Sequence, residues 1–161
     1  MSSTKNKLTI LLIFSFSIFA LIAAYFIQFI LGHQPCNLCL IERTPYFVSI
    51  ILILFLFISG KYEKKISMII CILFLFGAIV SFYHFGIEQG FFSESFVCDL
   101  ENKNINLSAS DLLKELEKNT VSCKDVTFKL LGFSLATLNT IISLIVSAIM
   151  LLKIINYDKN K

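Results

Sequence analysis

Residues 8–30 read LTILLIFSFSIFALIAAYFIQFI, a run without charged side chains in which Gln28 and a few serines are the main polar interruptions. The hydrocarbon core of a bilayer is about 30 Å thick, and a helix needs roughly 20 apolar residues to cross it. Three further segments qualify or nearly qualify, which gives approximate spans 8–30, 42–60, 66–84 and 129–152. Backbone polar groups cannot stay unpaired in lipid, so these spans must be helices. We therefore expect an all-α, polytopic membrane four-helix bundle.

The composition agrees with this fold class. Of the 161 residues, 57% are hydrophobic and only 16% are charged, which is too apolar for a soluble domain. Internal repeats, low-complexity tracts and flexible linkers are absent from the sequence. We therefore expect residues 1–161 to form a single membrane domain, in which outer loops 31–44 and 85–128 connect the spans.

The lysines predict the orientation in the membrane. They flank the first span on its N-terminal side, join the second span to the third in residues 61–65, and close the chain in residues 153–161. Lys and Arg concentrate in short cytoplasmic loops, so both termini and the 60–65 loop should be cytoplasmic. A cleaved signal peptide is the alternative for the first span. Its apolar run is about twice the usual length, however, and Ala23-Ala24 is a poor cleavage site. The net charge of +3 comes without the basic cluster that a nucleic-acid surface requires.

Four of the five cysteines fall on the predicted outer side of the membrane. Cys71 lies within the third span, where a thiol behaves as a small buried hydrophobic group. Cys98 and Cys123 bracket the long polar loop, and a structural disulfide between them would stabilise the protein by roughly 3–4 kcal/mol. Cys36 and Cys39 form a Cys-x-x-Cys motif, which encloses too few residues to constrain much chain. Its usual roles are thiol–disulfide exchange or metal binding.

Zinc is the alternative to redox chemistry for these thiols, because four cysteines can form a tetrahedral site. Structural zinc sites usually draw on two closely spaced ligand pairs, whereas Cys98 and Cys123 are far apart in sequence. His33 and His84 are possible substitutes, but their spacing to the cysteines matches no zinc motif. We expect no metal.

The neighbours of the Cys-x-x-Cys motif bear on its reactivity. Cys39 and Arg43 are four residues apart, so they share one face if the second helix begins near Pro35. Pro45 would then lie inside that helix and remove a hydrogen bond. In the alternative, Thr44 caps a helix that begins at Pro45, and the cysteines precede it in a tight turn. Arg43 itself fits either a role beside the thiols or that of an interfacial anchor.

Two further features lie on the predicted outer side. Residues 108–118 carry Leu112, Leu113 and Leu116 on one face after a capping serine, so we expect a short amphipathic helix, either on the membrane surface or packed on the bundle. His84 and Glu88 lie one helical turn apart at the exit of the third span. They are candidates to line a cavity for the headgroup of a lipid-soluble carrier, or an interfacial pair without such a role.

With these residues assembled, the chain resembles the DsbB family of membrane disulfide-generating proteins over nearly its whole length. Residues 35–43, Pro-Cys-Asn-Leu-Cys-Leu-Ile-Glu-Arg, are similar to the family's Pro-Cys-x-x-Cys-x-x-Glu-Arg signature. Residues 83–88 are similar to a Tyr-His-x-Gly-x-Glu pattern, and the segment from Cys123 to Asn139 resembles the entry to the family's fourth helix. The chain departs from the family before Cys98, where many members have Gly-Pro.

The resemblance implies a relay through two redox disulfides, Cys36–Cys39 and Cys98–Cys123. A reduced, periplasmic, thioredoxin-like DsbA oxidase would attack at Cys98. The released Cys123 would exchange with the Cys36–Cys39 disulfide, through a transient bridge between the loops. The Cys39 thiolate, held beside Arg43, would then donate to a bound quinone.

The resemblance further implies a bacterial inner-membrane protein that uses ubiquinone or menaquinone, with Arg43, His84 and Glu88 as quinone-binding candidates. Proteins like vitamin K epoxide reductase are a rival within the same chemistry, but they carry their Cys-x-x-Cys motif inside a later helix. A scaffold or transporter subunit with stapled loops is a rival of another class. Transporters usually carry charged residues deep in their spans, and these spans have none at mid-depth.

Overall fold

The computed structural model of the chain describes residues 2–60, 62–93, 123, 129–130 and 133–159. Its four long helices are α1 (Ser2–Phe29), α2 (Asn37–Ser59), α3 (Glu63–Glu88) and α5 (Leu135–Lys159). All four are long and apolar enough to cross a membrane, which confirms the predicted all-α membrane bundle. A minimal antiparallel hairpin of β1 (Lys129–Leu130) and β2 (Phe133–Ser134), which the sequence did not predict, precedes α5. The expected amphipathic helix at 108–118 lies outside the described residues.

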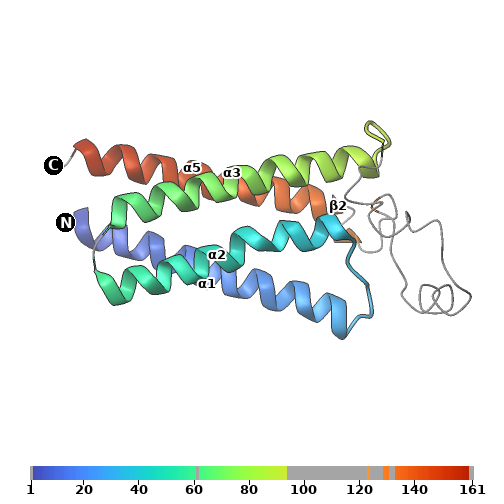
Figure 1. The fold of residues 1–161 in the computed structure, drawn as a ribbon, viewed down its shortest axis with the longest axis horizontal. Coiled ribbons are helices and arrows are strands. Elements are labelled where there is room, and N and C mark those ends of the chain that lie inside the picture. Colours follow the sequence, from blue (N-terminus) through green and yellow to red (C-terminus); the bar gives the residue numbers. More distant parts are fainter. Residues whose placement is uncertain (1, 61, 94–122, 124–128, 131–132, 160–161) are drawn as a thin grey trace, which may run out of the picture.

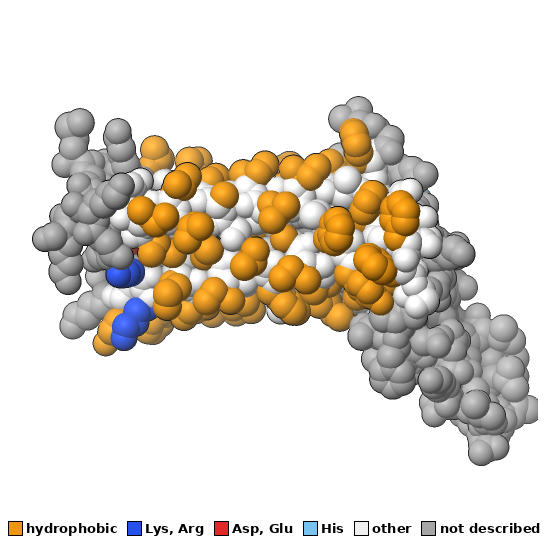
Figure 2. Space-filling view, turned by 90° about the horizontal axis from the view of Figure 1, so that it is seen from above, with side chains coloured by type: hydrophobic (Ala, Val, Ile, Leu, Met, Phe, Trp, Pro, Cys, Tyr) orange, Lys and Arg blue, Asp and Glu red, His pale blue; other side chains and the backbone are white. Residues whose placement is uncertain are grey.

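The helices form an elongated bundle in which α1 packs on α2, α2 on α3, and α3 on α5 (Figure 1). The start of α1, the connection between α2 and α3, and the end of α5 lie at one end of the bundle, which we call the terminal end. The start of α2, the end of α3 and β2 lie at the opposite end, the cysteine end. Figure 2 shows hydrophobic side chains along the bundle and Lys or Arg side chains gathered at the terminal end. The compartment that each end faces stays a prediction.

Helix α2 begins at Asn37, so the first of the two predicted alternatives for this region is the observed one. Cys36 is its N-cap residue, and the Cys36 Sγ accepts a hydrogen bond from the Cys39 backbone N–H at 3.4 Å. Pro45 lies inside the helix and packs against Gly77 of α3. A Cβ atom added at Gly77 would lie 3.0 Å from the Pro45 Cγ. The absence of a side chain at Gly77 therefore lets α2 and α3 approach closely at the level of the proline.

Small polar side chains join the helices across their apolar interfaces, as is common in membrane bundles. The hydroxyl groups of Ser17 on α1 and Ser49 on α2 are 3.2 Å apart, and both residues are fully buried. Cys71 on α3 is a free thiol that donates to the Ser147 carbonyl oxygen on α5 at 3.4 Å. These contacts satisfy polar groups locally and keep the helices in register.

A charged cluster closes the terminal end of the α3–α5 pair. The Lys153 Nζ lies 2.9 Å from the Glu63 Oε1 and donates to the Ser67 Oγ at 3.2 Å. The Lys153 side chain is 5% exposed, whereas that of Glu63 is 30% exposed. The cluster thus ties the last turns of α5 to the first turns of α3.

Candidate redox site

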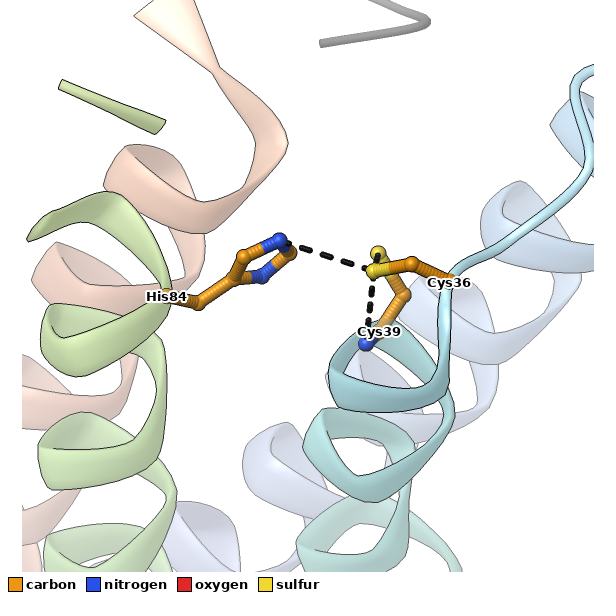
Figure 3. Close-up of side chains that lie close together, drawn as sticks. All are labelled: Cys36, Cys39 and His84. Carbon is orange, nitrogen blue, oxygen red and sulfur yellow. Dashed lines mark hydrogen bonds between the residues drawn. The ribbon is translucent and has the colours of Figure 1, made fainter. Parts of the chain in front are cut away.

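Two thiols and an imidazole converge at the cysteine end. Cys36 and Cys39 come from the start of α2, and His84 points toward them from α3 (Figure 3). The two sulfur atoms are 2.9 Å apart, and the Cys36 Sγ lies 3.5 Å from the His84 Nε2. Both cysteines are free thiols in this structure. Because an S–S bond is about 2.05 Å long, a displacement of less than about 1 Å would bring the sulfurs to bonding distance.

A buried polar network orients the histidine. The His84 Nδ1 lies 2.7 Å from the Glu42 Oε1 of α2, and both side chains are less than a tenth exposed. A carboxylate accepts hydrogen bonds, so Nδ1 carries a proton and donates to it. The Asn139 amide of α5 donates to the Glu42 Oε2 at 3.0 Å. The imidazole is therefore held with its Nε2 directed at sulfur.

Asn139 connects this network to two further helical residues. Its amide nitrogen donates to the Ser81 Oγ at 2.6 Å, and its Oδ1 accepts a hydrogen bond from the Tyr46 hydroxyl. Residues from α2, α3 and α5 thus meet at one amide group. A buried polar network is costly when any member is unpaired and rigid when all are paired, so Asn139 fixes the relative position of these three helices.

The surroundings of Cys36 favour its thiolate. The hydrogen bond with the Cys39 thiol, and then the contact with His84, hold the pKa of the Cys36 thiol well below its usual value, although burial opposes the shift. The position of Cys36 at the N-terminus of α2 acts in the same direction, because backbone N–H groups there favour negative charge. In the reduced pair, Cys36 is thus the thiol that loses its proton more readily.

Arg43 makes its contacts with α1. The Arg43 Nη1 donates to the Gln28 Oε1 at 2.7 Å, and the guanidinium lies 5.2 Å from the centre of the Tyr25 ring. The predicted cation beside Cys39 is therefore directed to the α1–α2 interface, and the imidazole of His84 is the basic group that contacts sulfur. The predicted roles of Arg43, beside the Cys39 thiolate and in quinone binding, stay predictions, and the contact of His84 with sulfur was not predicted from the sequence.

Glu88 extends the site on the α3 side. The Glu88 Oε1 lies 3.8 Å from the His84 Nε2, and the carboxylate is 6% exposed. Within the described part of the chain, the Glu88 Oε2 is buried and has no hydrogen-bond partner. The predicted role of His84 and Glu88 in quinone binding stays a prediction, and both residues lie in the same buried site as the thiols.

The second cysteine pair is represented by Cys123. This residue is disulfide-bonded and only 2% exposed. It belongs to a buried hydrophobic cluster with Cys36, Leu38 and Ile87, against which Cys39 packs. Cys98 lies outside the described residues, so the Cys98–Cys123 pairing stays a prediction. The structure thus brings one member of the second predicted pair to the first pair.

Several residues of this network had no role in the predictions from sequence. Tyr46 and Ser81 were not singled out, and Glu42 and Asn139 entered only through the family motif. One signal would have identified Glu42: a carboxylate within a membrane helix is expensive unless it is paired, so it requires a partner on another helix. That signal does not reveal which partner the helix packing supplies.

Four helices that are long and apolar enough to span a membrane, with a partly buried dithiol at one end and a histidine directed at one sulfur, define an integral membrane protein of thiol–disulfide chemistry. The comparisons with known proteins make the class specific. The family model described as "Disulfide bond formation protein DsbB" matches residues 6–153. The chain therefore belongs to the DsbB family and is a multi-pass membrane oxidoreductase of disulfide bond formation.

A curated protein of Rickettsia prowazekii (strain Madrid E), named "Uncharacterized protein RP370", is 29% identical to this chain over 142 residues. The match covers 87% of this chain and 83% of the Rickettsia protein, so the similarity extends over most of both chains. No solved structure matches the chain significantly.

Proposed function

We propose that this protein reoxidises a thioredoxin-like, DsbA-type disulfide donor and passes the electrons through two cysteine pairs to a membrane quinone. The observation that carries the proposal is the convergence of Cys36, Cys39 and His84 at a helix boundary in a membrane bundle. A dithiol at this end of the bundle would lie between a lipid-soluble acceptor in the membrane and a protein partner outside it.

The shared cluster of Cys36 and Cys123 supports exchange between the two pairs. In the proposed sequence, the partner's thiolate attacks the Cys98–Cys123 disulfide at Cys98 and displaces Cys123. The Cys123 thiolate then attacks the Cys36–Cys39 disulfide at Cys36 and displaces Cys39. The partner's second thiolate attacks the mixed disulfide and releases Cys98, and the Cys98 thiolate attacks the Cys36–Cys123 bridge at Cys123 and releases Cys36. Each attack forms one S–S bond and breaks another, so the partner leaves oxidised, the Cys98–Cys123 disulfide is restored, and the electrons remain on Cys36 and Cys39.

Reoxidation of the dithiol at Cys36 and Cys39 removes two electrons and two protons and forms one S–S bond. We propose that His84 holds a proton beside Cys36 and so keeps that sulfur as the thiolate. Glu42, fixed by Asn139, would accept a hydrogen bond from Nδ1–H and so stabilise the imidazolium that carries its second proton on Nε2. The same arrangement of thiol, imidazole and carboxylate activates nucleophiles in other enzymes.

The α1–α2 edge fits a quinone headgroup. Arg43 carries five N–H donors, and within the described residues one of them is given to Gln28. The Tyr25 ring beside it is 39% exposed, and Cys39 lies one helical turn before Arg43. A quinone bound there would accept two electrons and two protons. A DsbA-type partner is itself a strong oxidant, near −120 mV, so its reoxidation requires an acceptor of still higher potential.

The proposed location is a bacterial inner membrane, with both termini in the cytoplasm and the cysteine end at the periplasm. The lysines at the terminal end support this orientation. In this orientation, the DsbA-type partner and the long outer loop lie in the same oxidising compartment.

The decisive experiment mixes the purified protein anaerobically with a reduced DsbA-type partner and a soluble ubiquinone or menaquinone analogue, in buffer that contains a metal chelator. We expect stoichiometric loss of quinone absorbance that requires both the protein and the reduced partner. Cys71→Ser is the matched control and should retain full turnover. Quinone reduction that continues at the wild-type rate in Cys36→Ser would refute the proposed relay.

A further inference from the structure

The reduced site has the donor set of a metal-binding centre. The sulfur atoms of Cys36 and Cys39 and one ring nitrogen of His84 all lie within 4.8 Å of one another. Two thiolates and an imidazole are ligands that Zn²⁺ prefers. We expected no metal from the spacing of the cysteines and histidines along the chain, whereas this donor set is assembled across two helices.

The distances fit a tetrahedral ion after one small movement. With Zn–S near 2.3 Å and Zn–N near 2.0–2.1 Å, tetrahedral ligands are separated by about 3.6 Å for S and N and about 3.8 Å for two sulfurs. The observed distance from the Cys36 Sγ to the His84 Nε2 is 3.5 Å, and the sulfurs are 2.9 Å apart. A small rotation of the partly exposed Cys39 side chain would increase the distance between the two sulfur atoms to the value that a tetrahedral ion requires.

The surrounding residues have the features of a supporting second layer. Histidines that bind metals usually donate their other ring N–H to a carboxylate, which fixes the tautomer and raises the basicity of the ligand nitrogen. His84 does this with Glu42, and Glu42 is in turn held by Asn139. Glu88 provides an independent indication, because its buried Oε2 has no hydrogen-bond partner within the described residues, and its Oε1 lies 3.8 Å from the His84 Nε2.

We propose that the reduced thiols of Cys36 and Cys39, together with the His84 Nε2, bind one Zn²⁺ ion, with Glu88 or a water molecule as the fourth ligand, and that this ion blocks formation of the Cys36–Cys39 disulfide. Binding converts any protonated sulfur ligand to a thiolate and releases its proton to solvent, and no electron moves. The disulfide form offers no thiolate, so the site binds zinc only when it is reduced. Zinc is thus an inhibitor that is specific for one redox state.

The test measures zinc binding to the full-length protein in detergent after reduction, by competition with a chromophoric zinc indicator. We expect one tightly bound Zn²⁺ per chain in the reduced protein and none in the protein oxidised with diamide. Cys36→Ser and Cys39→Ser should abolish this binding. Cys71→Ser and the double variant Cys98→Ser/Cys123→Ser should retain it. Tight binding that survives in Cys36→Ser/Cys39→Ser, or equal binding by both redox states, would overturn the proposal.

The histidine and the carboxylates are tested with Co²⁺ as a spectroscopic probe. Thiolate-to-cobalt charge-transfer bands should appear in the reduced wild type, and His84→Gln should change the visible ligand-field bands and weaken Zn²⁺ binding at least about tenfold. Glu42→Gln, a positioning change, should weaken Zn²⁺ binding by about 10- to 100-fold and leave the charge-transfer bands in place. Unchanged zinc affinity in His84→Gln would rule out the proposed donor set.

Inhibition is measured without quinone, so that this inference and the proposed function fail separately. Diamide oxidises the reduced dithiol directly, and stoichiometric Zn²⁺ should slow this oxidation at least about tenfold, with recovery after addition of a chelator. Zinc protection combined with absent quinone turnover would leave the metal site intact and refute the relay. If quinone turnover proceeds normally in the presence of chelator but Zn²⁺ does not protect the dithiol from diamide, the zinc site is refuted and the relay stands.

Discussion

The two ends of the α3–α5 pair both bury charged side chains, but they use them differently. At the terminal end, Lys153 is held between Glu63 and Ser67, so its charge is balanced by groups that are its permanent neighbours. At the cysteine end, the hydrogen bonds run from Asn139 through Glu42 and His84 and reach the sulfur of Cys36. A chain of contacts that ends on a nucleophile can do chemistry, whereas one that ends on a carboxylate fastens helices together.

The largest difference between the two ends is expected when a sulfur atom at the cysteine end is removed. Cys36→Ser or Cys39→Ser should lower quinone-linked turnover at least about a thousandfold, because a serine hydroxyl can neither carry the disulfide nor exchange with one. Turnover is measured by anaerobic loss of quinone absorbance. The matched change at the partly buried thiol within α3, Cys71→Ser, should leave turnover within about twofold of wild type.

The next largest effect is expected from the group that contacts the sulfur. Thiolate is present above the pKa of its thiol, so the lowered pKa of Cys36 keeps it reactive as the pH falls below the usual thiol range near 8.5. His84→Gln should raise that pKa, and alkylation of Cys36 at pH 6 should slow roughly tenfold for each unit by which the raised pKa exceeds 6.

The measurement is the pH profile of iodoacetamide labelling of Cys36 in the Cys39→Ser/Cys71→Ser background with the outer-loop disulfide intact. Because Cys39 also stabilises the thiolate, the background is itself compared with the same protein carrying Cys39. If His84→Gln does not shift the pH dependence of labelling, the imidazole does not act on the sulfur. The network at the cysteine end would then hold helices together, as the ion pair at the terminal end does.

A smaller effect on turnover is expected at the shared amide. Asn139→Leu keeps a similar volume but removes the partner of Glu42, Ser81 and Tyr46, and buried polar groups that lose a partner cost about 1–3 kcal/mol. We expect a lower midpoint of thermal unfolding in detergent and a roughly tenfold loss of turnover, as the imidazole loses its fixed orientation. Turnover that stays at the wild-type level would assign Asn139 to helix packing alone.

The smallest effect on turnover is expected at the terminal end. Lys153→Met removes one partner of the ion pair, and because Glu63 keeps partial access to water we expect a stability loss of about 1–2 kcal/mol, well below that of a fully buried pair. Turnover at a temperature where the variant is folded should equal that of the wild type. Thermal unfolding and quinone reduction on the same sample separate the two quantities.

The bundle could be predicted from the sequence because span length and the absence of charge are local properties of residues 8–30 and its counterparts. The Cys-x-x-Cys motif, likewise local, identified Cys36 and Cys39. The contact of His84 with sulfur could not be predicted in this way, because it depends on the rotation of α3 against α2, which packing determines. For the same reason the sequence associated Arg43 with Cys39 from their spacing, whereas the guanidinium contacts Gln28 on α1.

The start of α2 illustrates a second limit. Pro45 left two helix starts open, because a proline inside a helix usually costs several kcal/mol. The helix nevertheless continues through it, and Gly77 accommodates the ring on the neighbouring helix. Gly77 is far from Pro45 in the sequence, so the residues around Pro45 do not reveal this compensation.

Gly77 lies two helical turns before His84 on α3, and it carries no chemical group of its own. A bulkier residue there would push α3 away from the Pro45 ring and would carry the imidazole with it, since a helix moves as a rigid rod over such a short length. A design that transfers the thiol pair to another membrane protein would therefore need the contact between a glycine and a proline ring as well as the cysteines and the histidine.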